Sequence, residues 1–157
     1  MFREMRRFKQ QVSKEECERI LDTEKRGVLS VHGEDGYPYA IPVDFYYDRE
    51  DGRVYIHGAK QGHKIDAIRA DDRVCFTVWD QGYLKEGVWG YHSTSVVIFG
   101  RAELITDIAK TTDKCRKLGF KYFPTAEFVE KEMKYVPEVC MIAITPDHMT
   151  GKLVHEQ

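Results

Sequence analysis

The residues of this chain that are best suited to bind an anion lie at a strand-to-helix junction within residues 53–70. Residues 54–56 have the composition of a strand, and residues 64–70 have the spacing of a helix with Ile65 and Ile68 on one face. Gly58 and Gly62 are expected to break the strand and to frame a short turn. Four basic side chains lie at the junction: His57, Lys60, His63 and Lys64.

This junction predicts a phosphate-binding site. Free backbone N–H groups at a helix N-terminus favour an anion, and a nearby lysine such as Lys64 adds a full positive charge. A solvated basic turn is the alternative interpretation, because short strand-turn-helix segments with lysines are common. The junction by itself leaves both interpretations open.

The composition limits the classes of protein to which the chain can belong. Its 157 residues predict a single domain, residues 1–157, that is long enough to bury a core. The net charge of -2 argues against a general nucleic-acid-binding protein. No apolar run is long enough to span a bilayer, and the N-terminus lacks the apolar core of a signal peptide. We therefore expect a cytoplasmic protein with neither a nucleic-acid nor a membrane partner.

The cysteines and histidines do not predict a metal site. Four cysteines lie far apart and form no C-x-x-C pair, which favours reduced structural thiols: Cys17, Cys75, Cys115 and Cys140. His57, His63 and the distant His92 have no carboxylate nearby at helical spacing. The chain also lacks a G-x-G-x-x-G following a strand, a Walker A loop and a G-x-S-x-G nucleophile elbow.

The expected elements form a mainly β, α+β protein. Ser13 and Glu16 form a capping-box pattern that begins a helix, and Gly27 is expected to end that segment. Gly100 is expected to mark a bulge or a bend in the longest strand. Strands are expected at 27–32, 37–47, 54–57, 73–79, 93–105 and 139–145, and further helices at 107–118 and 125–133. Hairpin turns without regular β-α alternation favour an antiparallel barrel with helical caps.

Four segments, in this order and spacing, resemble a known family: residues 37–43, 54–59, 62–64 and 95–102. The chain resembles the flavin-binding split β-barrel proteins related to pyridoxamine 5'-phosphate oxidase, and among these the nitroimidazole-resistance branch. The resemblance extends from about Phe8 to Thr145. It implies a Greek-key split β-barrel with flanking helices, and a homodimer with two FMN molecules at the subunit interface.

The resemblance also implies roles for individual residues. Backbone groups of Ile41, Pro42 and Val43 would hold the edge of the flavin ring, and the segment His57, Gly58, Ala59 would line the ring and the ribityl chain. In the segment Gly62, His63, Lys64, the lysine would meet the phosphate, and Ser95 would lie near the phosphate or the ribityl chain. His57 would be the reaction-site residue, because a histidine can donate a hydrogen bond or a proton near neutral pH.

The expected activity is transfer of electrons or hydride from NAD(P)H to a small planar or nitroaromatic-like substrate, with FMN carrying the chemistry. The chain lacks the C-terminal arginine- and histidine-bearing substrate segment of true pyridoxamine phosphate oxidases, which argues against oxidation of vitamin B6. Two alternatives stay open. One is a flavin-binding or flavin-storage protein without turnover, and the other is a haem-binding split barrel with a histidine as axial ligand.

Overall fold

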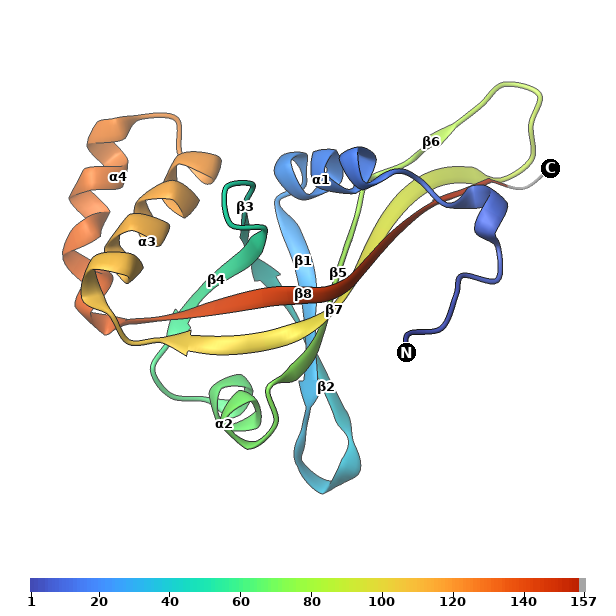
Figure 1. The fold of residues 1–157 in the computed structure, drawn as a ribbon. Helices are drawn as coiled ribbons and strands as arrows, with labels where there is room; N and C mark the ends of the chain where they lie inside the picture. The colour runs from blue at the N-terminus through green and yellow to red at the C-terminus, as the bar shows by residue number, and fades with distance from the viewer. Residues whose placement is uncertain (156–157) are drawn as a thin grey trace.

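A strongly curled antiparallel sheet organises the fold of this computed structural model, which describes residues 1–155 (Figure 1). The order of the strands is β2-β1-β5-β7-β8-β4-β3, and β6 pairs with β7. The strands are β1 Arg26–His32, β2 Pro38–Asp44, β3 Tyr46–Asp48, β4 Arg53–Ala59, β5 Arg73–Trp79, β6 Tyr83–Leu84, β7 Tyr91–Ile105 and β8 Val139–Val154. The α-helices are α1 Lys14–Thr23, α2 His63–Ala70, α3 Ile108–Tyr122 and α4 Ala126–Glu132, and the 3-10 helices are η1 Phe8–Gln10, η2 Glu34–Gly36 and η3 Met133–Glu138.

Alternating side chains give the sheet an inner face that forms the main core. In β5, Val74, Phe76 and Val78 are buried, and their neighbours Cys75 and Thr77 are only partly so. This period of two is the one expected for a strand with one face in the core. The same alternation runs through β1 and the first half of β7. The inner faces therefore enclose one apolar cluster inside the barrel.

The barrel is incompletely closed between β2 and β4. These strands belong to opposite halves of the sheet order, yet they pack against each other. Strand β3 is short and pairs only with residues 53–55 of β4, so residues 56–59 have no ladder partner on that side. Strand β2 pairs only with β1. Two open strand edges thus face each other, and the predicted split β-barrel is confirmed; we call this seam the split.

Two short helices cover the ends of the barrel core. Helix α1 contributes Ile20 and Leu21, and α2 contributes Ile65 and Ile68, all of them buried in the main cluster. The predicted start of α1 is confirmed, because the Ser13 side chain accepts a hydrogen bond from the backbone N–H of Glu16. The sheet and these two helices together position the junction that leads into α2.

Two predicted roles of glycines are wrong. Helix α1 ends at Thr23, and Gly27 lies inside β1, where a Cβ would fall 2.4 Å from the ring of Phe76. Gly58 does not break its strand, since β4 continues to Ala59 and Gly58 pairs with Cys140 of β8. Both glycines therefore serve close packing rather than chain termination.

The bulge predicted at Gly100 is confirmed. The register between β7 and β8 shifts between Phe99 and Gly100, and a Cβ on Gly100 would lie 2.5 Å from the carbonyl oxygen of Thr145. Beyond this point β8 continues as a strand to Val154, so the strand expected at 139–145 is longer than predicted. The long β7–β8 ribbon therefore reaches from α3 and α4 at one end to β6 and η1 at the other (Figure 1).

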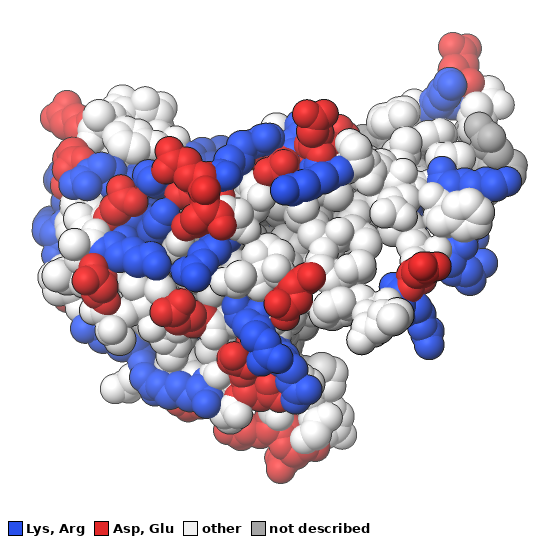
Figure 2. All heavy atoms as spheres, viewed as in Figure 1, with Lys and Arg blue, Asp and Glu red and all other residues white. Residues whose placement is uncertain are grey.

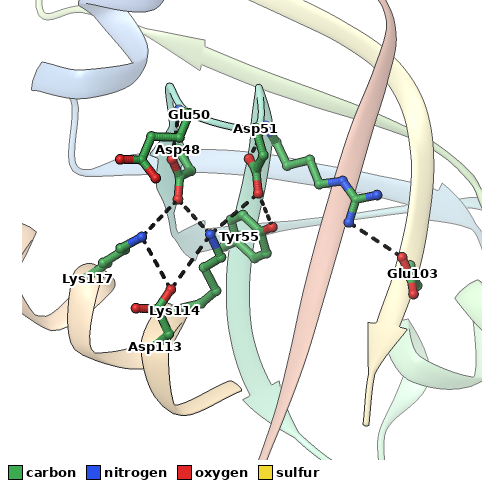
Figure 3. A network of polar contacts seen from close by, with 9 residues as sticks. Asp48, Glu50, Asp51, Tyr55, Glu103, Asp113, Lys114 and Lys117 are labelled. Carbon is green, nitrogen blue, oxygen red and sulfur yellow. Dashed lines mark hydrogen bonds and ion pairs between the residues drawn. The ribbon is translucent and has the colours of Figure 1, made fainter. Parts of the chain in front are cut away.

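Helix α3 packs on the outer face of the sheet through a polar network (Figure 3). The ammonium of Lys114 is 2.6 Å from a carboxylate oxygen of Asp48 and 3.4 Å from one of Asp51. It also lies 4.6 Å from the ring centroid of Tyr55, whose hydroxyl donates a 2.5 Å hydrogen bond to Asp51. Lys117 reaches the same oxygen of Asp48 at 3.5 Å. The network therefore ties α3 to the turn between β3 and β4.

The pKa values in this network favour the charged forms. Burial acts to raise the pKa of the Asp48 carboxyl, but hydrogen bonds from Lys114 and the Glu50 N–H outweigh it and hold that pKa below its usual range. Burial acts to lower the pKa of Lys114, and the hydrogen bond to Asp48 together with Tyr55 and Asp51 raises it instead. The pair is therefore a buried ion pair rather than a neutral hydrogen bond.

The surface carries mixed charges. Figure 2 shows lysine and arginine side chains interspersed with aspartate and glutamate over the face drawn. Such a face lacks the single-sign field that would concentrate a polyanion. Within residues 1–155, none of the helices has both the length and the apolar character needed to cross a bilayer.

Candidate functional site

Two of the segments predicted to bind the cofactor line the split. Ile41, Pro42 and Val43 lie on β2, and residues 57–59 form the end of β4. Ile41 and Val43 contact the core, whereas Pro42 is exposed. Because Pro42 cannot donate to a ladder, it is tolerated here at the sheet edge. Each edge presents backbone groups that the sheet does not use.

The third segment begins α2 with an uncapped N-terminus. Gly62 is the N-cap residue with φ of 138°, a conformation that favours glycine, and no side chain caps the first turn. The first helical hydrogen bond runs from the N–H of Asp66 to the carbonyl of Gly62 at 3.1 Å. The N–H groups of His63, Lys64 and Ile65 are therefore the free donors of this helix end.

Contacts of His63 and Lys64 join this helix end to both edges of the split. The His63 ring stacks on Tyr39 of β2, with ring centroids 4.0 Å apart. The Lys64 side chain lies over Gly58 of β4, where a Cβ would fall 3.1 Å from Cε and 3.3 Å from Nζ. The absence of a side chain at Gly58 therefore makes room for the lysine head. We call Gly58, Gly62, His63 and Lys64 the anion seat.

The charge of Lys64 is not neutralised by a neighbour. No carboxylate of residues 1–155 forms an ion pair with it. Burial raises the pKa of the Cys140 thiol, while Arg69, Lys60 and Lys64 oppose that rise, so three cations surround this stretch of β8. A thiol with a raised pKa is a poor nucleophile. The cations are thus placed to attract an external anion rather than to activate Cys140.

His57 lies on the other face of β4 from Gly58, because successive side chains of a strand point to opposite faces. It lines a pocket of about 620 Å³, a volume typical of small-molecule sites. We call this the helical pocket, because most of its wall comes from α3, α4 and η3. Its lining consists of Asp44, His57, Cys115, Leu118, Gly119, Tyr122, Phe123, Phe128, Val129, Glu132, Met133, Tyr135, Val136 and Val139.

Tyr122 fixes the wall of the helical pocket to the barrel. Its hydroxyl accepts a hydrogen bond from the N–H of Phe45 at 2.8 Å, and it lies within donating distance of the carbonyls of Phe45 and Lys25. Burial raises the pKa of Tyr122 to about 12. The neutral phenol therefore holds the end of α3 at the break between β2 and β3, beside the split.

Within one chain, Ser95 lies away from this site. It pairs with Trp79 of β5 and Lys152 of β8. His57 pairs instead with Met141, which pairs with Ile105 at the far end of β7. The ten residue steps from Ser95 to Ile105 cover roughly 33 Å along β7 at about 3.3 Å per step. The remaining predicted site residues meet around the split, and Ser95 does not.

Sequence reasoning missed most of the helical pocket. It predicted the two helices correctly, with α3 running on to Tyr122, but it gave them no role in a site. The available signal was the aromatic and apolar content of residues 118–136, which is also typical of ordinary helix packing. Tyr39 was missed as a partner of His63, because nothing in the sequence places β2 beside α2.

The site combines two environments that suit an amphipathic planar ligand. A cationic helix end can hold a phosphate, and an apolar pocket with one imidazole can hold a ring. The two lie on either side of β4, next to the open backbone edges of the split. Among residues 1–155, no group of three or more His, Cys, Asp or Glu side chains could hold a metal ion.

Comparisons with known proteins agree with this description. The sequence profile of the pyridoxamine 5'-phosphate oxidase family matches residues 13–153, nearly the whole chain. No curated protein matches the chain.

Solved structures with low sequence identity share the fold. A candidate 5-nitroimidazole antibiotic resistance protein from Bacteroides thetaiotaomicron is 22% identical, with 91% of this chain and 86% of that chain covered and a TM-score of 0.79. The flavocytochrome Anf3 from Azotobacter vinelandii is 23% identical, with 98% and 73% covered and a TM-score of 0.80. A FAD-binding protein from Mesorhizobium loti is 24% identical, with 92% and 96% covered and a TM-score of 0.65.

Proposed function

Because this chain belongs to the pyridoxamine 5'-phosphate oxidase family, we propose that it is a flavoprotein that binds FMN at the split. The anion seat is the observation that carries this proposal. Lys64 has no ion-pair partner within residues 1–155, lies over a glycine and stands beside three free N–H donors at the start of α2. These groups suit one phosphate monoester, which is the anionic end of FMN.

The choice of FMN over FAD rests on the size of the seat. FAD carries a pyrophosphate and an adenosine, and the sequence has no glycine fingerprint of a dinucleotide site. Two neighbouring structures are named FAD-binding proteins, and their likeness to this chain concerns the fold. A single uncapped helix end offers free N–H donors for one phosphate, which favours the mononucleotide.

The residues around the split have distinct tasks in this proposal. The open edge at Ile41, Pro42 and Val43 orients the ring, residues 57–59 line the ring and the ribityl chain, and Lys64 holds the phosphate. FMN, when bound, supplies hydride and electron transfer. His57 donates a hydrogen bond or a proton toward the ring from its place on the helical pocket.

The proposed reaction is transfer of electrons or hydride from NAD(P)H to a small planar or nitroaromatic-like substrate. The helical pocket supports this proposal, since its aromatic lining fits a flat ring. The name of the Bacteroides neighbour refers to 5-nitroimidazoles, which are compounds of this kind. The four cysteines are free, which suits the reducing cytoplasm in which we place the reaction.

The test is identification of the chromophore. The purified protein is denatured and the released compound is identified by chromatography, after an absorption spectrum of the folded protein has been recorded. We expect FMN, released at up to one molecule per chain. Release of FAD or haem, or failure to bind added FMN, would contradict the proposal. Turnover of NAD(P)H with a nitroaromatic acceptor then separates an enzyme from a flavin-storage protein.

A further inference from the structure

We propose that the helical pocket binds planar aromatic molecules that carry no negative charge, and that Glu132 and Asp44 set this preference. The inference rests on the proposed function, because it treats the pocket as the substrate side of a flavin site. It adds a substrate class to that function, namely neutral or cationic aromatic compounds, and excludes phosphorylated ones. This differs from the substrate in the family's name, which carries a phosphate.

The lining of the helical pocket carries the inference. Most of the wall is apolar or aromatic, with Leu118, Phe128 and Val136 as examples. The charged side chains that line it are the carboxylates of Glu132 and Asp44, and no lysine or arginine of residues 1–155 lines it. An anionic group of a ligand would lose water there without gaining a cationic partner.

The two carboxylates do not contribute equally. Asp44 lies 3.5 Å from the guanidinium of Arg26, and both side chains are well exposed, so part of its charge is compensated at the rim. Glu132 forms no ion pair with any of residues 1–155. Its charge is therefore the larger uncompensated one beside the pocket, and Glu132 is expected to contribute more to the preference.

The opposite charge of the anion seat reinforces this argument. Lys60, Lys64 and Arg69 lie around Cys140 at the α2 end of β4, while the helical pocket lies on the other face of that strand. If FMN occupies the seat, a substrate phosphate finds no second cationic site in the helical pocket. A charge gradient along the site thus orients the cofactor and excludes phosphorylated substrates.

The experiment compares three ligands that share a 4-nitrophenyl ring with a one-carbon substituent: 4-nitrobenzylamine, 4-nitrobenzyl alcohol and 4-nitrobenzoate. Their binding is measured by calorimetry at pH 8, with the FMN-loaded protein and with the FMN-free protein. We expect the amine and the alcohol to bind, and the benzoate to bind more weakly than the alcohol by roughly fivefold or more. Equal or tighter binding of the benzoate would overturn the proposal.

Two variants assign the preference to the carboxylates. Glu132→Gln should lower the ratio of amine to benzoate affinity, and addition of Asp44→Asn should lower it further. Glu127→Gln is the matched control, because Glu127 is an exposed residue of α4 that does not line the pocket. An unchanged ratio in the double variant, with the alcohol still bound, would overturn the assignment.

The measurements separate this inference from the proposed function. If the protein binds no flavin but still binds the benzoate more weakly than the amine and the alcohol, the proposed function fails and the pocket preference stands. If FMN binds and abolishes the binding of all three ligands, the pocket holds the flavin ring itself, and the substrate assignment is overturned. If FMN and the ligands bind together with the expected order, both are supported.

Discussion

Lys64 and Gly58 act as a unit at the residue scale. A glycine within a strand costs stability, and here it leaves space that the lysine head fills. The lysine thereby stands at a helix end whose N–H groups lack a side-chain cap. A phosphate bound there would meet both the ammonium and the free N–H groups.

We predict that Lys64→Ala weakens FMN binding by roughly tenfold to a hundredfold, because a charge-assisted hydrogen bond contributes about 1.5–3 kcal/mol. Riboflavin lacks the phosphate and should bind the variant as it binds the unaltered protein. Titration of both ligands by quenching of flavin fluorescence measures the two changes. Equal losses for both ligands would mean that Lys64 acts through folding instead. Gly58→Ala should weaken FMN binding less than Lys64→Ala does, since its Cβ would lie 3.1 Å from Cε and would shift the flexible lysine head only slightly.

We predict that His57→Ala retains most of the FMN and alters the chemistry. The His57 side chain lines the helical pocket and lies on the opposite face of β4 from the anion seat, so its loss removes no phosphate contact. Rapid-mixing measurements of flavin reduction by NAD(P)H and of reoxidation by a nitroaromatic acceptor should show a changed rate and a changed pH profile. Unchanged rates from pH 5 to 8 would assign His57 to packing alone.

The anion seat could be predicted from the sequence because it is local. Gly62, His63 and Lys64 are neighbours in the chain, and free N–H groups follow from any helix start that lacks a capping side chain. The helical pocket could not be predicted in this way. His57 and Phe128 meet in it from segments 71 residues apart, and helical spacing says which side of a helix is apolar but not what that side contacts.

At the scale of elements, the position of α3 depends on the polar network around Lys114. The Lys114 and Asp48 side chains are only 10% and 2% exposed, so their attraction is weakly screened. The next turns of the helix carry Cys115, Leu118 and Tyr122 into the wall of the helical pocket. A shift of α3 would therefore change the shape of the pocket.

We predict that Lys114→Met lowers the free energy of unfolding by about 3 kcal/mol, because it leaves the carboxylate of Asp48 buried without its closest partner. The ammonium of Lys117 lies 3.5 Å from the same carboxylate oxygen of Asp48, so it can partly replace Lys114 and limit the loss of stability. Urea denaturation measures the change. Arg116→Met on the same helix is the matched control, since its partner Glu130 is exposed, and it should leave the stability unchanged. A loss as small as that of the control would contradict the role of the network.

The same network predicts a pH dependence. The pKa of Asp48 is lowered in the folded protein, so its stabilisation is fully present above the unfolded value near 4 and is lost as the pH falls through the folded value. The difference in free energy of unfolding between the unaltered protein and Asp48→Asn should therefore be constant from pH 5 to 7 and should shrink below about pH 4. A constant difference down to pH 2 would contradict the lowered pKa.

The sequence predicted elements accurately where strand alternation or a helix cap determines their limits. It was less accurate where contacts with distant residues determine them. The hydroxyl of Ser13 and the alternation of residues 74–78 are local signals, and both were confirmed. Gly27 was misinterpreted as a helix stop because the sequence does not show that the ring of Phe76 crosses its position. A glycine needed for a close contact and a glycine needed for a turn look alike in a sequence.

At the scale of the whole molecule, we propose that a second chain completes the site, because Ser95 is separated from the split within one chain. The family resemblance places a serine at this position near the cofactor, yet in one chain it lies roughly 33 Å along β7 from the His57 end. The outer face of β7 also carries Phe99, which is 42% exposed and is covered in part by Phe2 of the N-terminal arm. A symmetric dimer could bring Ser95 of one protomer to the anion seat of the other.

We predict that FMN binds between two chains, and that two defective variants restore each other. Lys64→Ala removes the phosphate contact, and Ser95→Asp adds a repelling charge where the partner's phosphate would lie. Each variant alone should bind FMN weakly. Co-refolding equal amounts should restore tight binding at roughly a quarter of the sites, because half of randomly formed dimers are mixed and each mixed dimer has one intact site.

Sedimentation with flavin detection completes this test. If the site is shared, added FMN stabilises the dimer by mass action, and dilution of the protein releases flavin together with dissociation. Flavin absorbance that follows the dimer boundary at every concentration, together with complementation in the mixture, is the expected result. A monomer that keeps one tightly bound FMN at all dilutions, or a mixture that binds no better than its components, would place Ser95 outside the site.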